Sequence, residues 1–158
     1  MDELKKAEMI GRRFFKEYNF SIPVNIRKLV GVLDISLEYA DFDESGALLY
    51  QHDNGKKIII VNGNHPVDQQ RFHIAHEISH YLLDHKGKYF WSAPYKGKKP
   101  FIETCADACA SEILIPRGLL RRISYKHHFN VKVLKRIFQV SEQAMAFKLN
   151  LLKLPLKN

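Results

Sequence analysis

The segment that most constrains the fold is His76-Glu77-Ile78-Ser79-His80, which reads His-Glu-x-x-His. In an α-helix each residue advances by about 100°, so positions four apart lie on one face. The imidazoles of His76 and His80 can therefore bind one metal ion, with Glu77 beside the open position of that ion. Apolar neighbours give the helix a side to bury, namely Phe72, Ile74, Ala75, Ile78, Leu82 and Leu83. The segment predicts a metal-bearing helix on a packed core, and the alternative is a helix with two surface histidines.

A second helix is predicted from Glu103 to Leu114, and Pro116 ends it. A hydrolytic zinc site needs three protein ligands and one open position, and the first helix supplies only two. Glu103 is the best third ligand. Asp107, four residues later, shares its face and could accept the free ring N–H of a ligating histidine. We therefore predict that the metal ligands are His76, His80 and Glu103, that Asp107 supports them, and that Glu77 is the catalytic base.

Two other histidines compete for the third ligand position. His85 follows His80 by five residues, about 140° away if the helix continues, so it would point elsewhere. His73 falls on the metal-facing side of the helix, but three ligands from one helix would crowd a tetrahedral ion. We expect His73 to line the substrate pocket instead.

These two segments resemble the motifs of the ImmA/IrrE family of metallo-endopeptidases, and their ligand spacing is similar to that of thermolysin-like gluzincins. The matching positions are Arg71, Phe72, Ala75, His76, Glu77 and His80, then Glu103, Ala106, Asp107, Ala110, Ile113, Leu114 and Pro116. The chain departs from the family pattern at His73, Ser79 and Cys109, none of which is a ligand or the base. The resemblance implies a cytoplasmic enzyme that cleaves a helix-turn-helix repressor and so derepresses genes of a mobile element or phage. The metal would be zinc, with manganese as the alternative.

Length and composition are those of one globular domain. The chain has 158 residues, 46% of them hydrophobic and 27% charged. Its start has a charged segment and no apolar run, so we expect neither a signal peptide nor membrane association. The two cysteines, Cys105 and Cys109, fall away from Glu103 on their helix and are expected to be small core residues. We expect a cytoplasmic protein.

The order of elements predicts an α+β fold of the zincin type, with a small antiparallel sheet between a first helix and the two metal-bearing helices. Apolar periodicity indicates a helix over residues 3–18 and a short one over 25–30. Strands are expected at 33–39, 46–50 and 57–62, the last two joined by a turn at 53–55. One of the strands would form an edge on which a peptide substrate could pair.

The connection from Lys86 to Pro100 joins the two metal-bearing helices and contains five lysines and four aromatic residues. We expect a loop that lines a substrate channel, or alternatively a connector folded onto the core. The residue that would stabilise the oxyanion is left open among Tyr89, Tyr95, His73 and His128.

After Pro116 the chain is basic and helical, with helices expected at 131–138 and 141–152 and Ser141 as an N-cap. We divide the chain into a metallopeptidase domain, residues 1–116, and a helical extension packed on it, residues 117–158.

The apolar spacing of the extension is also that of a helix-turn-helix. With a net charge of +8, this makes a DNA-binding regulator with a structural or vestigial metal the alternative function, and nucleic acid a secondary partner. The sequence gives no oligomeric state.

Overall fold

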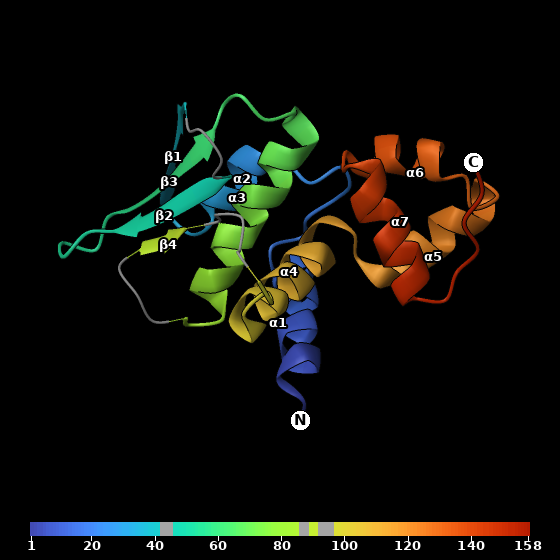
Figure 1. Ribbon diagram of the computed structural model, residues 1–158, viewed down its shortest axis with the longest axis horizontal. Helices are drawn as coiled ribbons and strands as arrows, with labels where there is room; N and C mark the ends of the chain where they lie inside the picture. Colours follow the sequence, from blue (N-terminus) through green and yellow to red (C-terminus); the bar gives the residue numbers. More distant parts are fainter. Residues whose placement is uncertain (42–45, 86–88, 92–96) are drawn as a thin grey trace.

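The computed structural model describes residues 1–41, 46–85, 89–91 and 97–158 and has the predicted α+β fold. A small sheet packs on the long helix α3, and α4 and α1 follow on the side of α3 away from the sheet (Figure 1). The C-terminal helices lie together beyond α4. In the described part of the chain, no helix is long and apolar enough to cross a membrane.

Two N-terminal helices begin the fold, each with a side-chain N-cap. Helix α1 spans Glu3–Glu17 and is capped by Asp2, whereas α2 spans Ile26–Gly31 and is capped by Asn25. Helix α1 buries a face that contains Gly11, where an added Cβ would lie 2.4 Å from the carbonyl oxygen of Cys109. Glycine is therefore required for the close approach of α1 to α4.

The sheet contains β1 (Ile35–Ala40), β2 (Ala47–Gln51), β3 (Lys57–Asn62) and β4 (Tyr89–Trp91), in the order β1-β3-β2-β4. The predicted turn joins β2 to β3, and Gly55 has the positive φ of +86° that a tight hairpin needs. The prediction of an antiparallel sheet was wrong in one pairing. Strands β1 and β2 are not neighbours in the sheet, because β3 lies between them. Strand β3 is antiparallel to β2, as predicted, but parallel to β1.

The expectation that 86–100 is a loop throughout was also wrong. Within it, Tyr89–Trp91 form β4, which pairs antiparallel with β2. This places β4 at one edge of the described sheet and β1 at the other.

The two helices that carry the predicted metal ligands occupy the centre of the fold. Helix α3 spans Val67–Leu82, and every residue from Ile74 to His80 is buried. Helix α4 spans Phe101–Leu114 and packs against both α1 and α3. Cys105 and Cys109 are buried free thiols, as predicted, and burial raises the pKa of Cys109 to about 11.

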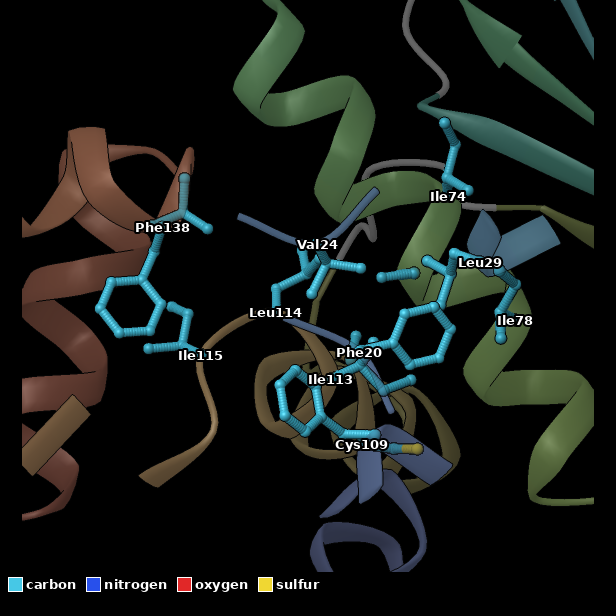
Figure 2. Packing of buried hydrophobic residues seen from close by; sticks show 14 of the residues in the cluster. Phe20, Val24, Leu29, Ile74, Ile78, Cys109, Ile113, Leu114, Ile115 and Phe138 are labelled. Carbon is cyan, nitrogen blue, oxygen red and sulfur yellow. The ribbon is translucent and has the colours of Figure 1, made fainter. Parts of the chain in front are cut away.

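Three helices end the chain: α5 (Arg117–Lys126), α6 (Val131–Phe138) and α7 (Glu142–Leu151), the last capped by Ser141 as predicted. The apolar core continues into them, and Figure 2 shows Phe138 of α6 pointing toward Ile115 at the end of α4. A buried ion pair also reaches across, because Lys148 Nζ lies 2.8 Å from Glu112 Oε1 on α4. The division into residues 1–116 and 117–158 stays a prediction.

Candidate metal centre

Three side chains from the two central helices converge at one point. His76 and His80 come from α3, and Glu103 comes from the first turn of α4. His76 Nε2 lies 2.9 Å from Glu103 Oε2, His80 Nε2 lies 3.3 Å from the same oxygen, and the two Nε2 atoms are 3.0 Å apart. All three residues are buried. The structure thus brings together the three residues that the sequence predicted as ligands.

This donor set fits a tetrahedral metal ion. Atoms bonded at about 2.0–2.2 Å to a tetrahedral zinc ion lie about 3.3–3.6 Å from one another, a few tenths of an ångström more than the three spacings above. Two ring nitrogens and a carboxylate oxygen that face one another are mutually repulsive unless a cation or proton lies among them. Within the described residues, these three are the only group that could hold a metal, so the site lacks a fourth protein ligand that would close it.

Asp107 occupies the supporting position predicted for it. Its Oδ1 lies 2.7 Å from His76 Nδ1, and its other oxygen pairs with Lys99. With Nδ1–H donated to Asp107, His76 presents the lone pair of Nε2 to the centre. Burial lowers the pKa of His76, but the hydrogen bonds to Asp107 and Glu103 outweigh it and raise this pKa to about 9.

His85 supports the second histidine, which the sequence reasoning missed. His80 Nδ1 and His85 Nδ1 are 2.7 Å apart, so one ring donates an N–H to the other. The expectation that His85 points elsewhere assumed a continuous helix. Instead α3 ends at Leu82, and Asp84, with a φ of +52°, turns the chain so that His85 folds back onto His80.

Glu77 and His73 lie on α3 on either side of His76 in the sequence, and His73 is half-buried. Glu77 is fully buried, and its charge raises the pKa of His76. His73 packs so closely on Gly46 that an added Cβ there would lie 2.4 Å from the imidazole Nδ1. Burial first, and then the nearby His65 and His76, lower the pKa of His73 to about 4, so this ring is neutral at pH 7.

The other candidates for oxyanion stabilisation are not brought to the centre by any described contact. His128 is exposed in the turn between α5 and α6. Tyr95 and the side chain of Tyr89 lie outside the described residues, as does much of the connection from Lys86 to Pro100.

The comparison with solved structures supports the fold. A Mycobacterium tuberculosis transcriptional regulator superposes on 92% of this chain with a TM-score of 0.65 and 16% sequence identity. The chain spans 46% of the length of that protein.

The comparisons of sequence identify the family. No curated protein matches the chain. The model of the IrrE N-terminal-like domain, a peptidase family, matches residues 30–150, which include α3 and α4. The chain belongs to the family of IrrE N-terminal-like peptidase domains.

Proposed function

We propose that this protein is a zinc-dependent endopeptidase whose ligands are His76, His80 and Glu103 and whose catalytic base is Glu77. The observation that carries the proposal is the convergence of the three ligand atoms within 4.8 Å of one another, without a fourth protein ligand in the described residues. Catalytic zinc sites have three protein ligands, whereas structural sites are closed by four. Manganese is the alternative metal.

The residues of the chain divide the chemistry among them. A bound zinc ion supplies a Lewis acid, which lowers the pKa of a bound water to about 7. Glu77, one residue after His76 and buried beside it, takes a proton from the attacking water and passes it to the leaving amine. Asp107 and His85 hold the two imidazoles in the orientation and tautomer that present Nε2. His73, a neutral ring on the same helix, is the described candidate for stabilising the oxyanion.

The proposed substrate is a helix-turn-helix transcriptional repressor, whose cleavage would turn on genes of a mobile element or phage. The ImmA/IrrE resemblance and the transcriptional-regulator name of the similar structure support a role in gene regulation. An enzyme of this kind in the cytoplasm must not cut unfolded chains freely. Specificity would then come from binding away from the scissile bond, which positions one substrate at the metal.

The alternative is a DNA-binding regulator that uses its C-terminal helices. In a helix-turn-helix made by α6 and α7, the second helix would enter the major groove. The only basic residue of α7 is Lys148, which is buried and paired with Glu112, while Phe147 and Leu151 are exposed. Phosphates attract exposed Lys and Arg, so α7 is poorly suited to DNA. Tight, sequence-selective duplex binding in about 0.2 M salt would favour this alternative.

The proposal is tested by incubating zinc-loaded protein with the helix-turn-helix repressor encoded nearest to it, and separately with casein. We expect cleavage of the repressor at few bonds and little digestion of casein. The matched control is Glu77→Gln, which keeps the size of the side chain and should lose at least about 100-fold in rate while it retains its metal. Cleavage by this variant at the wild-type rate would refute the mechanism, and efficient digestion of casein would refute the specificity.

A further inference from the structure

Arg71 is a buried cation that the proposed peptidase chemistry does not use. It lies on α3 with 7% of its surface exposed, and its Nε donates a hydrogen bond to the carbonyl oxygen of Gln139, 2.9 Å away. Its Nη2 is also buried and has no hydrogen-bond partner among the described residues. Within the same part of the chain, no carboxylate forms an ion pair with Arg71.

A buried charge of this kind is costly without a counter-charge. Removing a guanidinium from water is unfavourable, and hydrogen bonds together with an opposite charge usually offset this cost. The same loss of hydration disfavours the charged form of Arg71 and so lowers its pKa. The carbonyl at the end of α6 offsets part of the cost, because helix C-termini carry partial negative charge. The Nη2 amino group, which carries two N–H bonds, is left to bind a further acceptor.

Arg71 lines a surface pocket of about 800 Å³, a size typical of small-molecule sites. The pocket lies between α2, β1, α3 and the turn after α6. Much of its wall is apolar, including Leu37, Val67 and Ile74, and Arg27 adds a second cation. Pockets with apolar walls and a few convergent polar groups are typical binding sites.

A second, shallower pocket shares Arg71 and Val67 and includes Lys135 and Arg136. Asp68 is the one acidic residue in the lining of either pocket. The surroundings of Arg71 therefore have a positive charge balance.

We propose that the pocket at Arg71 binds a small organic carboxylate, with its charged end on the guanidinium and its apolar body against Leu37, Val67 and Ile74. A carboxylate matches the planar N–H groups of a guanidinium. Among the described residues that line the pocket, Arg71 is the only buried cation, so a monoanion balances its charge, whereas a phosphate dianion would leave excess charge against apolar walls. The site is independent of the proposed peptidase activity.

The ligand would act where the metal-bearing helix meets the C-terminal helices. Arg71 belongs to α3, which also carries His76. The hydrogen bond from Arg71 Nε to the carbonyl of Gln139 connects α3 to the turn between α6 and α7. A carboxylate on Arg71 would therefore strengthen the link between these two parts of the protein.

The test uses hexanoate as the probe, added to the full chain at constant ionic strength, with the side-chain Nε–H signal of Arg71 followed by NMR. We expect a saturable shift of that signal with hexanoate, a weaker response to inorganic phosphate, and none to hexanamide, which has the same body without the charge. No saturable shift with hexanoate, or an equal shift with hexanamide, would overturn the proposal.

Variants at Val67 separate binding from folding, because this side chain is 70% exposed and lines the pocket. Val67→Glu places a carboxylate beside Arg71 and should weaken hexanoate binding by at least about tenfold. Val67→Gln is its neutral control of matched size, which removes the same apolar contact without adding a charge and should therefore weaken binding less than Val67→Glu does. Arg121→Gln removes an exposed charge on α5 outside both pockets and should leave binding unchanged. Equal binding by the Glu and Gln variants would refute the assigned position of the carboxylate.

Discussion

Glu103 is the proposed ligand whose replacement tests the ligand assignment most directly, because it is the only one of the three from α4. We expect the wild type to bind one zinc ion per chain and Glu103→Ala to bind less than one under the same conditions. Metal analysis after dialysis measures this stoichiometry. The control is Asp107→Asn, which keeps all three ligands and should bind one ion about 10–100-fold more weakly. Full, tight occupancy in Glu103→Ala would refute the ligand assignment.

The raised pKa of His76 makes zinc binding depend on pH. In the metal-free protein this pKa is about 9, so a proton must leave His76 before its Nε2 can bind an ion at pH 7. The apparent association constant should therefore rise by about tenfold per pH unit up to pH 9 and then level off. Competition with a chromophoric chelator, corrected for the protonation of that chelator, measures the slope. A constant affinity between pH 7 and 9 would contradict this prediction.

The sequence predicted the side chains that converge at the centre of the fold, but it missed contacts that depend on the tertiary structure. His76, His80, Glu103 and Asp107 follow helical spacing, which is local and can be read directly. The contact of His85 with His80 depends on where α3 ends, and element boundaries are the least predictable local feature. Among the described residues, the buried Nη2 of Arg71 has no hydrogen-bond partner. This property depends on which groups surround Arg71 in the folded protein, and no local sequence pattern predicts it.

Helix α7 is held to α4 by charges that neither helix could bury alone. Glu112 is fully buried and accepts hydrogen bonds from Lys148 and Arg117, at 2.8 and 2.9 Å. Glu112→Gln should lower the free energy of unfolding by about 3–5 kcal/mol, because Lys148 would stay buried without its counter-charge. Urea denaturation measures this loss. The double variant Glu112→Gln, Lys148→Met should recover much of it, and a loss as large as in the single variant would refute the explanation.

The same pair sets a response to acid. Burial raises the pKa of Glu112, but Lys148 and Arg117 outweigh it and hold this pKa below its ordinary 4.5. The stabilisation from this ionised carboxylate is therefore complete above about pH 4.5 and is lost as the pH falls through the lower folded-state value.

Helices were predicted more accurately than the sheet. Ser141 is a local N-cap signal that was predicted and that the structure uses, and Asp2 and Asn25 cap α1 and α2 in the same way. The parallel pairing of β1 with β3 joins residues more than 20 positions apart, which no short sequence window reveals. Strand β4 has only three residues, and pairing with β2 rather than its own sequence pattern gives it strand geometry.

Metal binding should stabilise the protein as a unit, because the proposed ligands join α3 to α4 and these helices contact the sheet and α1. We expect a chelator to lower Tm. Free zinc at 100 times Kd should raise the free energy of unfolding by about 2.7 kcal/mol over the metal-free protein. Thermal unfolding at several zinc concentrations measures this dependence. Glu77→Gln, which keeps the ligands, should respond as the wild type does, and a Tm independent of zinc would contradict the prediction.

Glu112 also limits how this protein can be recombined with its relatives. Its carboxylate lies near the end of α4, while two of its partners, Arg117 and Lys148, follow Pro116 in the chain, and Arg12 lies 3.5 Å away on α1. A chimera that joins residues 1–116 of this protein to the C-terminal helices of another family member would keep Glu112. It would lose Arg117 and Lys148 unless the other member has basic residues at the same positions. Chimeras should therefore tolerate exchange within surface turns better than exchange at Pro116. Residues 1–116 and the C-terminal helices are therefore expected to be inherited together.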